Sequence, residues 1–116
     1  MRLHVHNEAS LKRFNRLKHK YNKIVIKYHM NGCMHCEEFR STWKQCTKNA
    51  NNKKVLFVNL DSSVLSNHKL DNHFKQVHGF PTIKLFSKKP KTHKFKVKTF
   101  KQKRSKKNVL KFLKSK

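Results

Sequence analysis

The short stretch NGCMHC, from Asn31 to Cys36, holds the residues of this sequence whose types and spacing are best suited to chemistry. Two cysteines that are separated by two residues can form a redox-active dithiol, supply two ligands of a zinc ion, or serve as ordinary buried thiols. The spacing alone does not decide among these three readings. The decision depends on the elements that position Cys33 and Cys36.

The pair is expected to lie between a strand and a helix. KIVIKYH, residues 23–29, is rich in β-branched residues and ends before Asn31 and Gly32, which is typical of a buried strand followed by a turn. After Cys33 the apolar residues recur every three or four positions, which predicts an amphipathic helix. The expected inward face of this helix carries Cys36, Phe39, Trp43, Cys46 and Ala50.

A cysteine at the start of a helix is suited to nucleophilic attack. The positive end of the helix dipole stabilises a thiolate, so we expect Cys33 to be the attacking thiol. Cys36, one turn into the helix and partly buried, is expected to be the resolving thiol. A protonated His35 between them would favour the thiolate and therefore the reduced pair, which makes the disulfide a better oxidant.

The rest of the chain alternates between helical and strand patterns in the same way. Further helices are predicted at about 8–21, weakly at 65–77, and after Ser105, and further strands are predicted at 55–60, 79–86 and 93–100. This order indicates an α/β fold in which a mixed sheet is flanked by helices on both faces. We expect a single domain over residues 1–116, with an N-terminal helix at about 8–21 and a redox core at about 23–113.

A zinc site is the main alternative chemistry. Its candidate ligands are Cys33, Cys36 and Cys46 with either His29 or His35. Structural zinc sites usually bring a second pair of closely spaced ligands, which this sequence lacks, and Cys46 lies about 15 Å from Cys36 along one helix. We therefore expect no metal and no cofactor beyond the cysteine pair. Cys46 is interpreted as a core thiol, and the remaining histidines, His68, His73, His78 and His93, as surface residues.

Three segments, IVIKYHMNGCMHC, VLFVNLD and VHGFPTIKLF, resemble the thioredoxin superfamily in the same order. The resemblance covers about residues 23–113 and is closest to the catalytic domains of protein disulfide isomerases. Their motif is Cys-Gly-His-Cys, so His35 is retained and Met34 replaces the glycine. The resemblance implies a thioredoxin fold and a thiol–disulfide oxidoreductase or isomerase activity that acts on protein thiols and disulfides.

The same resemblance implies a substrate-binding role for GFPT, residues 79–82. This segment matches the pattern around the cis-proline of the family, so Pro81 is expected to be cis and to lie beside the cysteines. The backbone of Phe80 is expected to pair with an extended substrate segment, as in strand addition.

The sequence departs from the family near the cysteines. Gly32 replaces a tryptophan, Glu37 replaces a lysine, and Lys27 replaces a buried carboxylate that helps to move the proton of the resolving thiol. We expect Lys27 to tune the pair, either as a neutral amine that accepts the Cys36 proton or as a cation that stabilises the Cys36 thiolate. These differences leave open whether the protein oxidises or reduces its substrates.

The charge of the chain suggests a second, different function. Lys and Arg number 30 and Asp and Glu number 5, which gives a formal net charge of +25 at pH 7. Such a charge favours nucleic acid or another polyanion as a partner, so the alternative is a redox-inactive basic binding module on a thioredoxin scaffold. Asn and Lys also share A/T-rich codons, so a nucleotide bias could produce the same excess without any selected partner.

The sequence has no recognisable targeting segment. The N-terminal residues lack the apolar run of a secretory signal, no stretch is long and apolar enough to span a membrane, and the C-terminal KFLKSK is not an ER-retention signal. We therefore expect a monomer in a cytoplasmic or nuclear-type compartment. There the cysteine pair would need a recycling partner, such as a sulfhydryl oxidase or a reductase.

Overall fold

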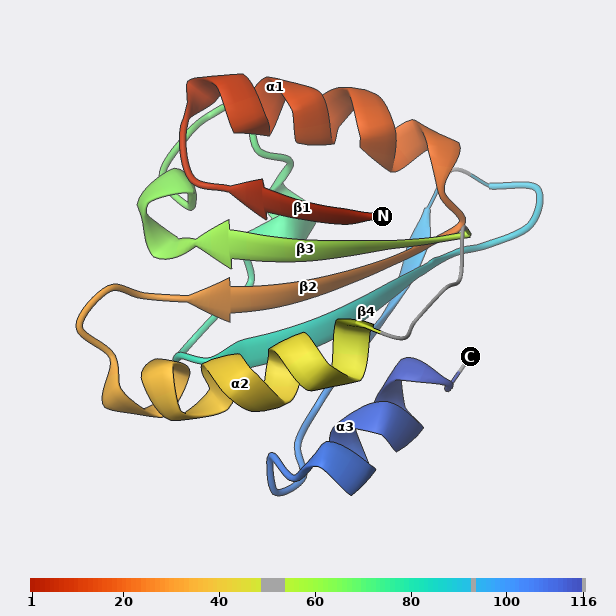
Figure 1. Ribbon diagram of the computed structural model, residues 1–116. Coiled ribbons are helices and arrows are strands. Elements are labelled where there is room, and N and C mark those ends of the chain that lie inside the picture. The colour runs from red at the N-terminus through yellow and green to blue at the C-terminus, as the bar shows by residue number, and fades with distance from the viewer. Residues whose placement is uncertain (49–53, 93, 116) are drawn as a thin grey trace.

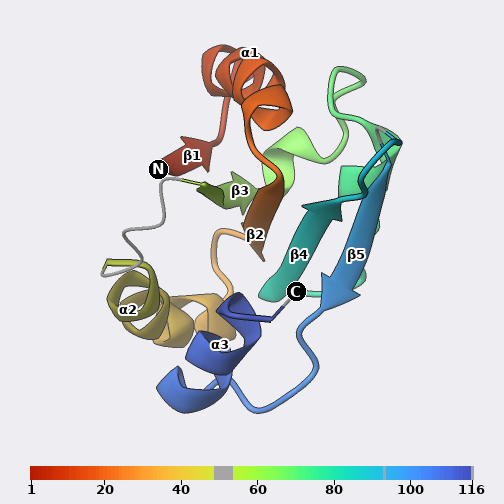
Figure 2. The same ribbon diagram turned by 90° about the vertical axis from the view of Figure 1, so that its right-hand side faces the viewer.

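The computed structural model describes residues 1–48, 54–92 and 94–115 and has three layers. Within these ranges a five-stranded sheet lies in the middle and helix α1 (Glu8–Leu17) covers one of its faces. Helices α2 (Met34–Lys48) and α3 (Lys106–Leu113) cover the other face (Figures 1 and 2). This arrangement confirms the predicted α/β architecture, with a mixed sheet flanked by helices on both faces.

The order of the strands places the ends of three of them beside the start of a fourth. Across the sheet the strands are β1 (Arg2–Val5), β3 (Val55–Asp61), β2 (Lys23–His29), β4 (Thr82–Lys88) and β5 (Phe95–Thr99). β1, β3 and β2 are parallel, whereas β4 and β5 are antiparallel to their neighbours. The carboxyl ends of β1, β3 and β2 therefore lie at the same edge as the start of β4 (Figure 1).

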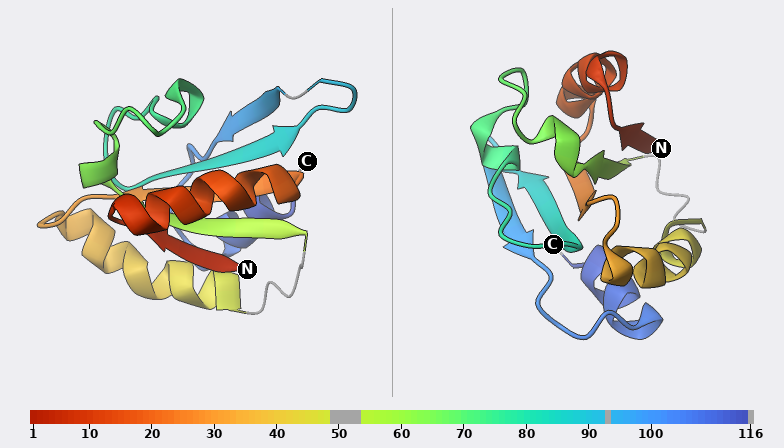
Figure 3. Two further views of the ribbon diagram at one scale, coloured as in Figure 1. Left: turned by 90° about the horizontal axis from the view of Figure 1, so that it is seen from above. Right: turned by 90° about the vertical axis from the view of Figure 1, so that its left-hand side faces the viewer.

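The alternation of side chains along each strand divides the core into two clusters. One cluster lies under α1 and includes Leu11, Phe14, Ile24, Ile26, Leu56, Val58 and Phe86. The other lies under α2 and α3 and includes Val25, Phe39, Trp43, Phe57, Ile83, Leu85 and Val109. Figure 3 shows α1 and the pair α2 and α3 on opposite sides of the sheet.

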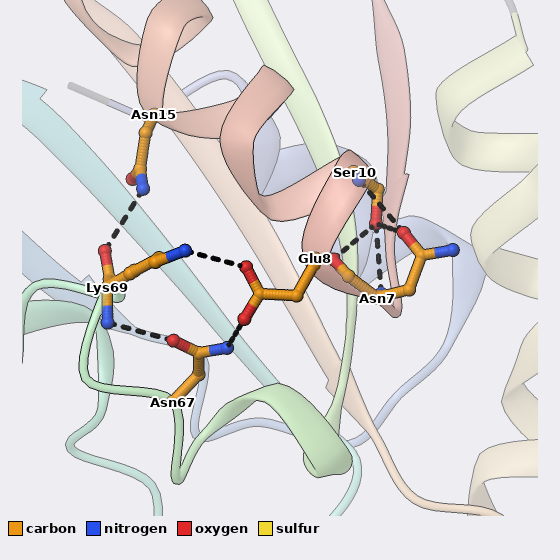
Figure 4. Close-up of polar contacts among 6 residues, drawn as sticks. All are labelled: Asn7, Glu8, Ser10, Asn15, Asn67 and Lys69. Carbon is orange, nitrogen blue, oxygen red and sulfur yellow. Dashed lines mark hydrogen bonds and ion pairs between the residues drawn. The ribbon is translucent and has the colours of Figure 1, made fainter.

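Helix α1 is anchored at its N-terminus and along its side. Asn7 is the N-cap, and a capping box links its side chain with Ser10. The carboxylate of Glu8 accepts hydrogen bonds from Asn67 Nδ2 at 2.7 Å and from Lys69 Nζ at 3.1 Å (Figure 4). The helix therefore also holds the long connection that follows β3.

Strand β1 is absent from the elements that the sequence pattern predicts. It has four residues, and only Leu3 and Val5 point into the core. Two apolar positions are too few to establish a periodicity, and the strand exists because β3 pairs with it in parallel. The missed strand matters for the site, because it carries Arg2 and His4.

The prediction of a weak helix at residues 65–77 is wrong. The described chain has one 3₁₀ turn in this region, at Asn72–Phe74, and another just before it, at Ser62–Val64. The side chain of Asn67 accepts a hydrogen bond from the backbone N–H of Lys69 at 2.9 Å. Such local bonds compete with a helical ladder. The helix predicted at 8–21 also ends earlier, at Leu17, and continues as a 3₁₀ turn at Lys18–Lys20.

Some expectations concern residues outside the described ranges. The predicted inward position of Ala50 and surface position of His93 both lie there. Within the described ranges, none of the helices has the length and apolar character needed to cross a bilayer.

Candidate active site

Cys33 lies in the turn that joins β2 to α2. Its backbone N–H donates to the carbonyl oxygen of Met30 at 3.3 Å, and Gly32 before it has a φ of +80°, which glycine adopts without strain. Helix α2 begins with the next residue, Met34. The Sγ atom of Cys33 accepts a hydrogen bond from the backbone N–H of Cys36 at 3.2 Å. The thiol is therefore at the helix N-terminus, as the sequence pattern predicted.

The loop before β4 brings Phe80 and Pro81 to the same place. The Cys33 thiol donates to the carbonyl oxygen of Phe80 at 3.7 Å, although the two residues are 47 positions apart in the sequence. The Phe80–Pro81 peptide bond is cis, the isomer that the family resemblance implies. Thr82 Oγ1 donates to the Gly79 carbonyl at 2.6 Å and closes the turn. The partly exposed Cys33 thus lies directly beside the GFPT segment.

Cys36 differs from Cys33 in its environment. Its side chain lies in the interior and is 7% exposed. Burial raises the pKa of the Cys36 thiol, and a hydrogen bond between the Cys36 and Cys33 side chains also raises it. The positive charge of Lys27 lowers this pKa and so partly opposes burial. The three cysteines are present as free thiols.

Lys27 is buried on β2, beneath α2, and is 6% exposed. Burial lowers the pKa of its ammonium, and repulsion from Arg40 lowers it further, whereas Cys36 and Glu37 raise it. Its Nζ lies 5.9 Å from the centroid of the Trp43 ring. The residue that replaces the carboxylate of the family is therefore electrically coupled to the proposed resolving thiol.

His35 and Glu37 both point to solvent on the first turn of α2. His35 Nδ1 lies 3.7 Å from Glu38 Oε2 and both side chains are well exposed, so the described partner of His35 is a carboxylate and not a sulfur. Glu37 Oε1 lies 3.4 Å from Arg40 Nη2. The negative charge at Glu37 is therefore partly offset by its neighbour. The tuning role of His35 stays a prediction.

Cys46 lies in the core, far along α2 from the pair. It is 2% exposed, its Sγ donates to the Lys106 carbonyl at 3.8 Å, and burial raises the pKa of its thiol. These contacts agree with the interpretation of Cys46 as a core thiol. Among the described residues, no group of three or more His, Cys, Asp or Glu side chains is arranged to hold a metal ion.

Two methionines beside the pair were not identified by sequence reasoning. Met30 is 43% exposed and Met34 is 73% exposed, so both present apolar surface on either side of Cys33. The signal that marks these methionines is that their apolar side chains are exposed. Exposure cannot be read from a sequence pattern, so the sequence did not identify them.

A pocket behind Cys36 was also missed. It has a volume of about 370 Å³ and lies between α2 and the strands β1, β3 and β2, from Cys36 to Thr47 along the helix. We call it the basic pocket, because six basic side chains line it: Arg2, His4, Lys27, His29, Arg40 and Lys44. Cys36 and Asn59 also contribute to its wall. Of the six basic residues, sequence reasoning singled out Lys27 for its effect on the cysteines and His29 as a candidate zinc ligand. It did not bring the six together, because they come from two strands and a helix that meet only in the folded chain.

Comparison with known proteins places the fold. The family model described as Thioredoxin matches residues 4–115. The J-Trx1 fragment of ERdj5 superposes with a TM-score of 0.69 at 15% identity, over 97% of this chain and 49% of that fragment. The Trx4 domain of ERdj5 gives a TM-score of 0.68 at 13% identity, over 96% of this chain and 90% of that domain.

A third solved structure is the first thioredoxin domain of mouse protein disulfide-isomerase A4. It superposes with a TM-score of 0.63 at 20% identity, over 91% of this chain and 69% of that one. This chain therefore spans about half of the J-Trx1 fragment and most of each isolated thioredoxin domain. No curated protein gives a significant sequence match. The family match and these folds agree with the expected thioredoxin fold, and the chain belongs to the thioredoxin family.

Proposed function

We propose that this protein is a thiol–disulfide oxidoreductase that acts on protein substrates through Cys33 and Cys36. The observation that carries the proposal is the position of the Cys33 sulfur. It lies 3.2 Å from the Cys36 backbone N–H at the start of α2 and 3.7 Å from the Phe80 carbonyl oxygen. A sulfur that is partly exposed, at a helix N-terminus and beside a segment that can pair with an extended chain, is suited to attack a protein disulfide.

The reaction proceeds in two exchanges. The Cys33 thiolate attacks one sulfur of a substrate disulfide, so the substrate S–S bond breaks, one substrate thiolate leaves and a mixed disulfide forms. Cys36 then loses its proton and attacks the Cys33 sulfur, which releases the second substrate thiolate. The substrate gains two electrons and the protein is left with a Cys33–Cys36 disulfide. The reverse sequence oxidises a substrate dithiol.

The surroundings of the pair supply the remaining roles. Lys27 accepts the Cys36 proton or stabilises the Cys36 thiolate, and His35 adjusts the stability of the reduced form. The Phe80 backbone beside Pro81 binds the substrate chain, and the exposed apolar surface of Met34 contacts its side chains. A protein of the sulfhydryl oxidase class, or a reductase, restores the starting form of the pair.

The test is to compare Cys33→Ser with Cys46→Ser in the reduction of a protein disulfide and in oxidative refolding of a reduced protein. Cys33→Ser should lower both rates to background, whereas Cys46→Ser, whose sulfur lies in the core, should stay within about twofold of the wild-type rate. Cys36→Ser should accumulate a mixed disulfide on Cys33, visible by mass spectrometry. Wild-type rates in Cys33→Ser would contradict the proposal.

The direction of the reaction follows from the reduction potential of the couple. Equilibration with glutathione buffers, read by alkylation of the free thiols, gives this value. A potential near that of thioredoxin, about −270 mV, would mark a reductant, and one near that of the isomerases, about −180 mV or above, would mark an oxidant.

A second candidate function rests on the exposed lysines of the C-terminal third. Lys94, Lys96, Lys98, Lys106, Lys107 and Lys111 are exposed on or beside β5 and α3. Binding of nucleic acid through these lysines would weaken steeply with salt, because each neutralised phosphate releases a counterion. The double variant Cys33→Ser/Cys36→Ser should then bind an oligonucleotide as tightly as the wild type. Binding that is weak and independent of salt would contradict this candidate.

A further inference from the structure

The face of the sheet under α2 changes from apolar to polar along its length. Val25 and Phe57 are buried in the core beneath the helices. One step further toward the carboxyl ends, the strand registers pair His4 with Asn59 and Asn59 with Lys27. Residues that are paired across strands point to the same face, so these three side chains lie side by side under the first turns of α2. They form the floor of the basic pocket.

The charges around this floor are nearly all of one sign. The cationic side chains are Arg2 from β1, Lys27 from β2, and Arg40 and Lys44 from α2. His4 from β1 and His29 from β2 add imidazole rings that are neutral at pH 7.5, because burial lowers their pKa values below the usual 6.5. The acidic side chain on its wall is Glu37, which is exposed and lies 3.4 Å from Arg40. The nearby Asp61 is 3.7 Å from His29 Nε2. Two carboxylates do not balance the positive charge that converges here.

Several polar groups of the pocket have no partner. Within the described residues the Lys27 ammonium makes no hydrogen bond or ion pair, although the residue is only 6% exposed. Its Nζ lies 5.9 Å from the centroid of the Trp43 ring. His29 Nδ1 and Asn59 Oδ1 are buried and likewise lack a hydrogen-bond partner among the described residues. A buried ammonium or amide without a partner is costly, so such groups call for a partner such as water, an ion or a ligand.

The pKa directions of the basic groups are consistent with a site that favours an anion. Burial lowers the pKa values of Lys27, His29 and His4, and each is lowered further by at least one positive neighbour in the pocket or beside it. A bound anion would supply the opposite charge and the hydrogen-bond acceptors that these groups lack.

We propose that the basic pocket binds a small phosphate-type oxyanion, either free phosphate or the phosphoryl group of a small phosphomonoester, through Lys27, Arg40 and Asn59. Lys27 and Arg40 supply cationic donors from opposite walls, and the Asn59 amide between the strands can turn its NH₂ group to the anion. The volume of about 370 Å³ leaves room for an organic substituent beyond the phosphoryl group. The site adjoins Cys36 and does not require the redox activity.

The high charge of the chain makes a matched control essential, because a protein of net charge +25 attracts anions over its whole surface. Arg40→Gln removes one charge from the pocket, and Arg13→Gln removes one from the exposed side of α1, on the opposite face of the sheet. Asn59→Asp adds a carboxylate to the pocket floor, and Asn22→Asp adds one before the start of β2, at the far end of the strand. Each pair changes the net charge equally.

Titration calorimetry of the reduced protein with inorganic phosphate, at constant ionic strength and about pH 7.5, measures the affinity. The wild type should bind one phosphate per chain. Arg40→Gln and Asn59→Asp should each weaken binding about tenfold or more, as expected for loss of a charge-assisted bond, while Arg13→Gln and Asn22→Asp should stay within about twofold. Phosphate should also shift the NMR signals of the His4 and His29 rings.

Two further measurements identify the source of the phosphoryl group and test for nonspecific binding of phosphate as a counterion. Glycerol 3-phosphate that binds as tightly as phosphate, or more tightly, assigns the site to phosphomonoesters, and a clear preference for inorganic phosphate assigns it to the free anion. Binding that does not saturate, or that weakens equally in the pocket variants and their controls, would mean that phosphate collects only as a general counterion, and the proposal would be overturned. Because Arg40 is exposed, its variant tests the site without disturbing the fold.

Discussion

The ammonium of Lys27 and the thiol of Cys36 line the same pocket and act on each other's ionisation. Burial favours the neutral form of both groups, since it raises the pKa of Cys36 and lowers that of Lys27. Each group also favours the charged form of the other, because Lys27 lowers the pKa of Cys36 and Cys36 raises that of Lys27. This mutual effect is what the proposed role of Lys27 requires, namely to assist the departure of the Cys36 proton in place of the carboxylate that the family resemblance implies at this position.

Lys27→Met should slow the resolution of a mixed disulfide on Cys33. The variant loses both the amine that could accept the Cys36 proton and the charge that favours the thiolate, so the rate should fall by about tenfold or more. Stopped-flow release of the substrate thiol measures this step. The control is Lys84→Met, since Lys84 is also buried in the sheet but donates to the Gln76 carbonyl on the other face. An unchanged rate in Lys27→Met would contradict both roles of the lysine.

Met34→Ser should weaken the reduction of protein disulfides without affecting small ones. Met34 is 73% exposed beside Cys33, and the loss of this apolar contact should raise KM for a protein substrate about threefold. The rate with a small aromatic disulfide should not change. Val97→Ser on β5 removes a residue that is 45% exposed and distant from the cysteines, and it should leave both rates as they are. A similar loss in both variants would mean that Met34 has no specific contact with the substrate.

Tyr28→Phe should reduce stability without altering the redox potential. The Tyr28 hydroxyl donates to the carbonyl oxygen of Phe74 at 2.7 Å in the core, and burial raises the pKa of this phenol. Removal of the donor leaves a buried carbonyl unsatisfied, so the free energy of unfolding, measured in urea, should fall by about 1–2 kcal/mol. Tyr21→Phe is the matched control, because its hydroxyl donates to Met1 Sδ at 3.6 Å in an exposed contact. Equal stability of the two variants would show that the buried bond contributes nothing.

The protein should lose stability as the pH falls from 7 to 5, in part because of His29. Burial lowers the pKa of His29 below its usual 6.5, and Lys27, His4 and Arg40 act in the same direction against the opposing charge of Asp61. Around pH 6 the unfolded state therefore binds more protons than the folded state, so the free energy of unfolding decreases as the solution becomes more acidic. Urea midpoints at several pH values should decline less in His29→Gln than in the wild type. Parallel declines would contradict this contribution.

Much of the fold could be predicted from the sequence because its elements have strong local patterns. The buried run KIVIKYH became β2 over residues 23–29, and the apolar spacing after Cys33 became α2. The elements that failed had weak patterns. β1 has only two inward apolar residues, and the region at 65–77 has polar side chains that bond to the nearby backbone. For such segments the outcome depends on pairing and packing with distant parts of the chain.

By itself, the sequence determined where the reactive pair lies within its element, because two cysteines in one helical turn, after an Asn-Gly turn, are set by local geometry. Only the tertiary structure decided what surrounds the pair. The Phe80 carbonyl reaches Cys33 because β4 runs antiparallel beside β2, and the basic pocket exists because parallel pairing places His4, Asn59 and Lys27 in one row. Contacts between residues so far apart depend on strand order and register, which no short stretch of the sequence specifies.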